Sequence, residues 1–179
     1  MTFSNPAADA TASAKAYVRA LLDVLGDRQP LDVLPELMSW LEARLRGVPE
    51  QVLRRPEAPG KWSVTEVVQH LADSELVFGF RSRMILSEDR PPLQGYDQDK
   101  WASLFRYSEV SYESALAQLG VLRGANLALL RRLGPAELAR VGMHSERGPE
   151  SLDLLIRMMG AHDLVHRRQI ERVLGKVGA

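Results

Sequence analysis

The chain has 179 residues, of which 45% are hydrophobic and 26% are charged, a composition typical of one globular domain with a buried core. Its 23 basic and 23 acidic residues cancel, so there is no net charge to attract nucleic acid or an anionic membrane surface. Cysteine is absent, which excludes disulfides, thiolate metal ligands and a cysteine nucleophile. Any bound metal must therefore be held by nitrogen and oxygen atoms.

Residues 1–30 are predicted to form an N-terminal extension with a short helix that ends at Gly26. The extension lacks the basic start and the continuous apolar run of a signal peptide. No later segment approaches the roughly 18 uninterrupted apolar residues that a membrane span requires. We therefore expect a cytoplasmic protein that binds neither nucleic acid nor membranes.

Residues 31–179 are predicted to form one bundle domain. Apolar residues recur at helical spacing in four segments, which are residues 31–46, 63–86, 111–133 and 151–174. Ser63 and Glu66 form a capping-box pattern at the start of the second segment, and Ser151 can cap the fourth. No window shows the alternation of a β-strand. The expected fold is all-α, an antiparallel four-helix bundle of the up-down type with one long connection and an additional N-terminal helix.

Three of the four histidines lie on helix faces that are otherwise apolar. His162 and His166 are one turn apart in the last helix, and His70 has the phase of the core residues in the second helix. A single inward histidine is more often a hydrogen-bonded core residue than a ligand. Three on two helices would each need partners for both ring nitrogens inside an apolar bundle. One divalent ion bound by all three would meet this need and leave positions open for water or substrate.

Two carboxylates flank His70 in the sequence. Glu66 lies four residues before it and Asp73 three residues after it, so both can share its side of the helix. Either could orient the imidazole or act as a base towards a metal-bound water. The alternatives are helix capping for Glu66 and a solvent-facing position for Asp73, and Asp73 is the candidate catalytic residue.

Three other polar residues are less clearly placed at the predicted metal site. Asp163 falls about 100° from the face of His162 and is expected to be exposed or at the helix edge. Gln169 could face the mouth of a cavity or continue the polar edge of the helix. His144 is expected in a loop, where a functional role is the less favoured alternative.

Three segments together resemble a known family: GKWSVTEVVQHLADSE in the second helix, PPLQGYDQDKWA in the long connection and LLIRMMGAHDLVHRRQI in the last helix. They are similar to the DinB-like family, the DinB/YfiT group of metal-binding four-helix bundles, and cover the chain from about residue 31 to residue 174. The resemblance implies that His70, His162 and His166 bind one divalent ion, zinc or nickel.

The resemblance also implies a metal-dependent enzyme. The first hypothesis is a transferase that activates a thiolate at the three-histidine site, with a small thiol such as bacillithiol or mycothiol and an electrophilic substrate as partners. The second is a hydrolase that uses metal-bound water, with Asp73 as the base. The third is a non-catalytic, stress-linked metal-binding protein, which would close the site with a fourth protein ligand that the sequence does not offer.

A homodimer is expected, mainly from the resemblance. Apolar residues outside the bundle stripe offer interface surface; these are Phe78, Phe80, Phe105 and Tyr107.

Overall fold

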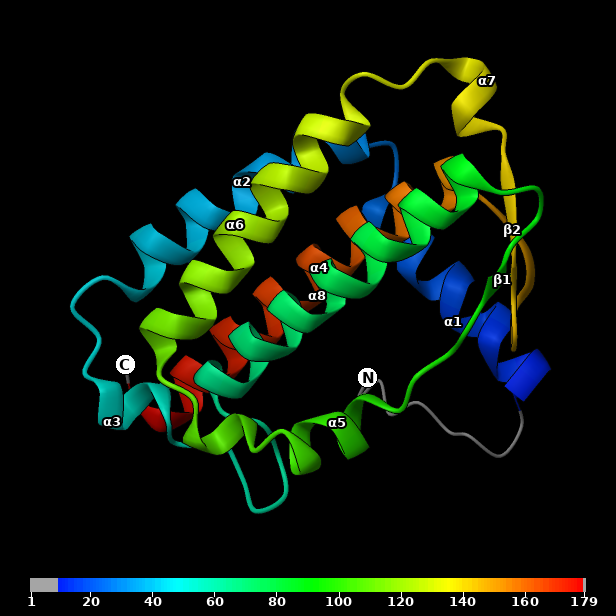
Figure 1. Cartoon of the computed structure of the whole chain (residues 1–179). Helices are drawn as coiled ribbons and strands as arrows, with labels where there is room; N and C mark the ends of the chain where they lie inside the picture. Colours follow the sequence, from blue (N-terminus) through cyan, green and yellow to red (C-terminus); the bar gives the residue numbers. More distant parts are fainter. Residues whose placement is uncertain (1–9, 179) are drawn as a thin grey trace.

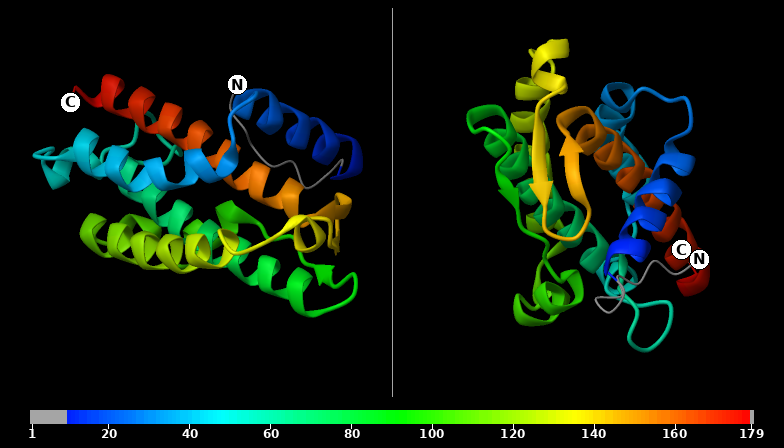
Figure 2. Two further views of the ribbon diagram at one scale, coloured as in Figure 1. Left: turned by 90° about the horizontal axis from the view of Figure 1, so that it is seen from above. Right: turned by 90° about the vertical axis from the view of Figure 1, so that its right-hand side faces the viewer.

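The fold is seen in a computed structural model that describes the backbone of residues 10–178 and the side chains of residues 14–178. Its elements in chain order are α1 (Ala10–Leu25), α2 (Pro30–Leu45), α3 (Glu50–Leu53), α4 (Val64–Ser87), β1 (Pro92–Leu93), α5 (Gln98–Leu104), the 3-10 helix η1 (Tyr107–Glu109), α6 (Tyr112–Leu130), α7 (Pro135–Leu138), β2 (Val141–His144), β3 (Gly148–Ser151) and α8 (Leu152–Val177). The long helices α2, α4, α6 and α8 pack together, and α1 lies against α8 (Figures 1 and 2). The predicted four-helix bundle with an additional N-terminal helix is confirmed.

The N-terminal helix packs on the bundle through its apolar face. Leu21 and Leu25 of α1 belong to the same buried cluster as Leu155 and Met158 of α8. Residues 1–9 of the predicted extension lie outside the described residues, and the division of the chain at residue 30 stays a prediction.

Helices α4 and α8 begin at the predicted capping residues. The side chain of Ser63 accepts a hydrogen bond from the Glu66 backbone, and the Glu66 carboxylate accepts one from the Ser63 backbone, which completes the capping box of α4. Ser151 accepts a hydrogen bond from the backbone of Leu154 at the start of α8. Helix α8 ends at Val177 and is capped by Gly178, whose φ of 82° suits glycine.

The helix directions differ from the expected antiparallel arrangement, because α4 and α6 run parallel (Figure 1). Gln69 near the start of α4 bonds to Gln118 near the start of α6, and Arg83 near the end of α4 bonds to Asn126 near the end of α6. Helix α4 has 24 residues and is about 36 Å long. The connection formed by residues 88–111 is long enough to return along the bundle, so α6 begins at the same end as α4.

A small sheet closes one end of the bundle, although the sequence shows no strand pattern. Strand β1 pairs in parallel with β2, and β2 pairs antiparallel with β3 (Figure 2). These strands have two to four residues, which is too short for an alternating pattern to be recognised. His144 was expected in a loop. It is instead the last residue of β2, and its side chain is buried.

Two apolar clusters fill the bundle, and a polar belt lies between them. On α8 the buried members of the first cluster end at Ala161 and those of the second begin at Ile170. On α4 the second cluster ends at Ala72 and the first contributes Ile85. The buried side chains between these limits are polar; they include Asp73, Ser74, Glu75, Arg81, His162, Asp163 and His166. A belt of buried polar side chains therefore separates the two apolar clusters near the middle of the bundle.

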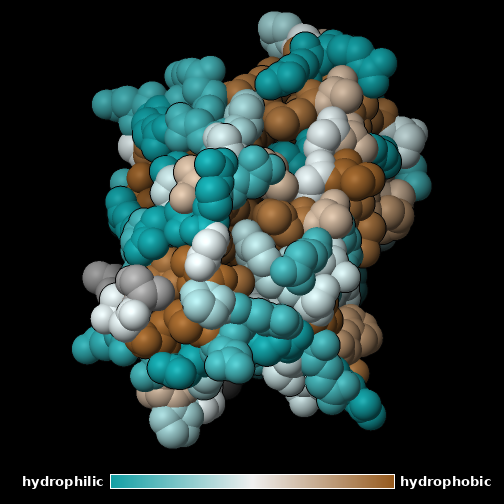
Figure 3. Space-filling model, turned by 90° about the vertical axis from the view of Figure 1, so that its left-hand side faces the viewer, coloured by the Kyte–Doolittle hydropathy of each residue, from teal (hydrophilic) through white to brown (hydrophobic). Residues whose placement is uncertain are grey.

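The surface mixes polar and apolar residues. On the face that Figure 3 shows, hydrophobic patches are separated by hydrophilic side chains. Among the described residues, none of the helices combines the length and the apolar composition that a membrane crossing requires.

The four residues expected to offer interface surface have different environments. Phe80 and Phe105 are 63% and 56% exposed, whereas Phe78 is half-buried beside the ring of His162. The interpretation of Tyr107 was wrong, because its ring is buried and its hydroxyl is bonded inside the protein. The homodimer itself stays a prediction.

Candidate metal centre

Three histidines from α4 and α8 meet in the polar belt. The Nε2 atom of His162 lies 3.1 Å from the Nε2 atoms of both His70 and His166. All three side chains are buried, and their ligand atoms lie within 4.8 Å of one another. The structure thus brings together the three residues that the sequence singled out.

The donor set fits a divalent ion. A neutral imidazole has one lone pair or one N–H at Nε2, so His162 Nε2 cannot form full hydrogen bonds with both neighbours at once. A cation among the three atoms would accept all three lone pairs. Two nitrogens that lie about 2.0–2.1 Å from one ion, at angles of about 90–110°, are about 2.9–3.4 Å apart. The observed 3.1 Å separations fall within this range.

The surroundings keep the imidazoles neutral, as metal ligands must be. Burial lowers the pKa of His70 and His162 well below the usual histidine value, and the charge of neighbouring histidines lowers both further. Burial also lowers the pKa of His166 to about 4. Around neutral pH all three lone pairs are therefore available.

One histidine has a partner that fixes its orientation. The Nδ1 atom of His166 lies 2.7 Å from the Oε1 atom of Gln169, so Nδ1–H donates to the amide oxygen and the lone pair is on Nε2, facing His162. The side chain of Gln169 therefore turns towards His166 and does not merely continue the polar edge of the helix. His70 Nδ1 is buried without a hydrogen-bond partner in the part of the chain that the structure describes.

Asp73 lies in a hydrogen-bonded cluster beside the histidines. Its carboxylate accepts from the hydroxyl of Tyr107 at 2.5 Å and from the side-chain amides of Gln69 and Gln118 at 3.2 and 3.3 Å. Burial, and then this hydrogen bond to Asp73, raise the pKa of the Tyr107 phenol. Within residues 14–178, no hydrogen bond joins Asp73 to the three histidines. The carboxylate is buried, and its expected solvent-facing alternative is wrong.

The hydroxyl of Ser74 lies next to the histidines and contacts a second hydroxyl. Ser74 Oγ is 3.4 Å from His70 Nε2 and 3.1 Å from the hydroxyl of Tyr96, which belongs to the long connection. Burial raises the pKa of Tyr96, so its phenol stays protonated. The phase of Ser74, four residues after His70, is visible in the sequence. The contribution of Tyr96 depends on the route of the connection, which the sequence pattern does not reveal.

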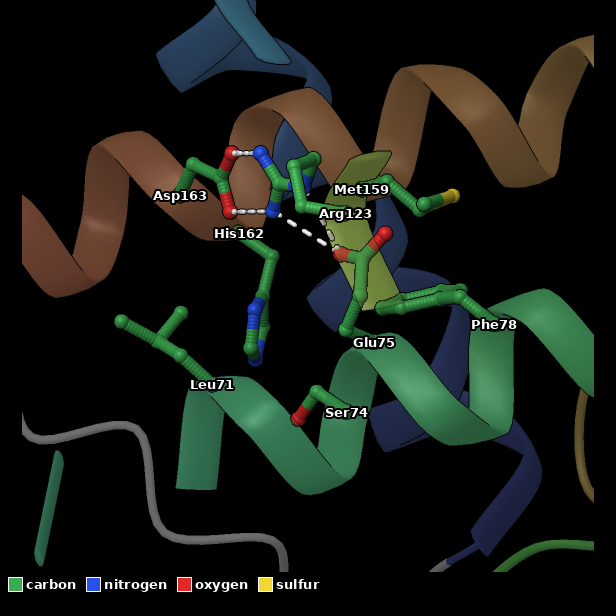
Figure 4. A pocket seen from close by; sticks show the side chains of 8 residues that line it. All are labelled: Leu71, Ser74, Glu75, Phe78, Arg123, Met159, His162 and Asp163. Carbon is green, nitrogen blue, oxygen red and sulfur yellow. Dashed lines mark hydrogen bonds and ion pairs between the residues drawn. The ribbon is translucent and has the colours of Figure 1, made fainter. Parts of the chain in front are cut away.

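Asp163 was expected at an exposed position, but it is 2% exposed. Arg123 of α6 forms two hydrogen bonds with its carboxylate, at 2.6 and 3.0 Å, and a further one with Glu75 of α4 at 3.0 Å. Figure 4 shows Arg123 between the two carboxylates, with the imidazole of His162 pointing away from them towards α4. The expectation was wrong because α8 contacts α1, α2 and α4, so more than one of its faces is buried.

The sequence analysis missed Arg123. The signal was present, because Leu119, Arg123, Asn126 and Leu130 recur at spacings of four, three and four, which places two polar residues on the core face of α6. Arg123 also donates to the backbone oxygen of Leu34 in α2 at 2.6 Å. One guanidinium therefore links all four long helices next to the histidine centre.

A bundle with three inward histidines defines a class of metal-site proteins, and sequence comparison gives the family. The profile of the DinB superfamily matches residues 38–170, and the chain belongs to this superfamily. The solved structure of YfiT from Bacillus subtilis superposes with a TM-score of 0.72 and 27% sequence identity, over 84% of this chain and 90% of that chain. That structure is described as "a probable metal-dependent hydrolase with an unusual four-helix bundle topology".

Two other relatives have related names. A Bacillus licheniformis protein is 31% identical over 149 residues, which are 83% of this chain and 77% of the relative. A protein of Oceanobacillus iheyensis is 33% identical over 110 residues, and this alignment spans 60% of this chain and 63% of that protein. Both are named "Putative metal-dependent hydrolase".

Proposed function

We propose that the protein is a metal-dependent hydrolase in which His70, His162 and His166 bind one divalent ion. The observation that supports this most strongly is the convergence of three neutral imidazoles inside the bundle, with Nε2 of His162 3.1 Å from Nε2 of both His70 and His166. The names of the relatives support the same class of reaction.

The ligand set suits catalysis better than a structural role. Within residues 14–178, no further histidine or carboxylate joins the three. A structural zinc site usually has four protein ligands, whereas a catalytic site keeps one position open. When bound, a divalent ion supplies Lewis acidity, which lowers the pKa of a water or thiol that it contacts. Nitrogen ligands suit zinc and nickel, which are the proposed metals.

Asp73 is the proposed proton acceptor. It lies on α4 three residues after His70, and the hydroxyl of Tyr107 together with two amides holds its carboxylate in one orientation. Asp73→Asn should keep the metal and lower the hydrolysis rate about a hundredfold if the carboxylate accepts a proton. An unchanged rate would assign Asp73 to holding Tyr107 in place.

A small-thiol-dependent transferase is the second candidate. The same open position can accept a thiolate, a soft anion that suits zinc and nickel. The chain has no cysteine that would compete for this position. In this reaction the thiol would attack an electrophilic small molecule.

One experiment separates the candidates. Untagged, metal-loaded protein is assayed against simple esters and a panel of electrophiles, with and without bacillithiol, mycothiol, glutathione or coenzyme A. Ester cleavage without thiol supports the hydrolase, and turnover that requires thiol supports the transferase. His162→Ala should abolish either activity, whereas Arg168→Ala, an exposed change on the same helix, should not. If the metal-loaded protein turns over none of these substrates, the result would favour a non-catalytic metal-binding protein.

A further inference from the structure

A buried arginine, Arg81, lies on α4. Arg81 is 6% exposed, and its Nη2 atom donates to the backbone oxygen of Gln94 at 2.5 Å. Among the described side chains, no carboxylate forms an ion pair with it. A guanidinium has five N–H groups, and a buried charge without a counter-ion is costly. The remaining donors of Arg81 are therefore available to an anion.

A second buried donor lies in strand β2. The Nδ1 atom of His144 accepts a hydrogen bond from the backbone N–H of Glu146 at 3.1 Å, so the proton of the neutral ring is on Nε2. This Nε2 is buried and has no hydrogen-bond partner in residues 14–178. Buried N–H groups are nearly always paired, so this one calls for an acceptor.

Arg81 and His144 lie near the same end of the sheet. Gln94, the acceptor for Arg81, directly follows Leu93, which pairs with His144 across β1 and β2. The charges of Arg147 and Arg81 add to the effect of burial and lower the pKa of His144 to about 3.

Two carboxylates, Glu146 and Glu150, are close enough for their negative charges to act to raise the pKa of Arg81. Glu150 is engaged in an ion pair with Arg147, and Glu146 is partly exposed. Neither of them neutralises Arg81 by direct contact, so the arginine keeps its donors for another acceptor.

Arg81 and the histidine centre lie on one side of α4. Ser74 and Arg81 are seven residues apart, so they share a helix face and are separated by about 10 Å along the axis. Tyr96, two residues after Gln94, bonds to Ser74, which is next to His70. The long connection therefore links the two groups of residues through Tyr96.

We propose that Arg81 and the Nε2–H of His144 bind an acidic group of the substrate, such as a carboxylate, while the reacting bond lies at the histidine centre. The substrate class is then an ester or amide with an acidic group about two helical turns from the bond that breaks. The identity of this substrate rests on the proposed hydrolase function, whereas the acid-binding site does not.

The site is tested first without metal. Acetate is titrated into the metal-free protein, and the His144 ring signals are followed by NMR. Wild type should show saturable binding, and Arg81→Met should weaken it at least tenfold. Arg83→Met is the matched control, because Arg83 is exposed on the same helix and bonds to Gly79 and Asn126. Circular dichroism verifies the fold, and Arg81→Lys should restore part of the affinity. Equal binding by wild type and Arg81→Met, or no saturable binding, would overturn the proposal.

The second arm compares an ester that has a distal carboxylate with its neutral methyl ester, using metal-loaded protein. Arg81→Met should raise KM at least tenfold for the acidic ester and leave the neutral ester unchanged. Equal effects on both esters would contradict the substrate class. If acetate binds as expected but neither ester is cleaved, the proposed hydrolase fails and the acid-binding site stands.

Discussion

The side-chain oxygen of Gln169 lies 2.7 Å from Nδ1 of His166, one helical turn away on α8. This contact leaves the Nε2 lone pair of His166 facing the other two histidines. Gln169→Leu should therefore weaken zinc binding by about 10–100-fold, because the imidazole loses the group that fixes its tautomer. Competition against a chromophoric chelator measures the affinity. Arg168→Leu is the control, and equal affinities for the two variants would contradict the role of Gln169.

The network around Arg123 should matter for stability. Arg123→Met leaves Glu75 and Asp163 buried without their counter-ion and should lower the free energy of unfolding by about 3–5 kcal/mol. Urea denaturation of the metal-free protein measures this change. Arg132→Met, at an exposed position where the side chain bonds to the backbone oxygen of Ala128, should cost less than about 0.5 kcal/mol. A loss below about 1 kcal/mol in Arg123→Met would show that the buried ion pairs are not needed.

The pH dependence of stability should include a contribution from His144. Its pKa is about 3 in the folded protein, against about 6.5 when unfolded. Between these values the unfolded state binds the extra proton, so the free energy of unfolding falls as the pH decreases from about 6.5 towards 3. His144→Phe should remove up to about 1.4 kcal/mol of this loss per pH unit. Urea denaturation at several pH values measures both proteins, and parallel curves would refute the assignment.

The sequence predicted the histidine centre because helical phase places side chains on faces. His70, His162 and His166 interrupt apolar stripes, and this pattern is sufficient to bring them together once the helices pack. The same method failed for Asp163, since periodicity assumes one buried face and α8 is enclosed on several sides. Arg123 could have been found by its spacing from Leu119.

Other features depend on the path of the chain. The parallel arrangement of α4 and α6 follows from a connection that runs back along the bundle, and its length alone does not fix that route. Strand β1 has two residues, and each pairs with a residue of β2 that is 51 positions later in the sequence. Such pairing has no local sequence signal, so the position of His144 in a strand could not be predicted.

The central claim is that three histidines bind one divalent ion, and metal analysis tests it most directly. Untagged protein is loaded with zinc or nickel, passed over a desalting column and measured by inductively coupled plasma mass spectrometry, beside His162→Ala and Arg168→Ala. Wild type and Arg168→Ala should retain about one ion per chain, and His162→Ala almost none, with its helical circular dichroism spectrum unchanged. Wild type without bound metal, or His162→Ala with as much metal as wild type, would contradict the assignment.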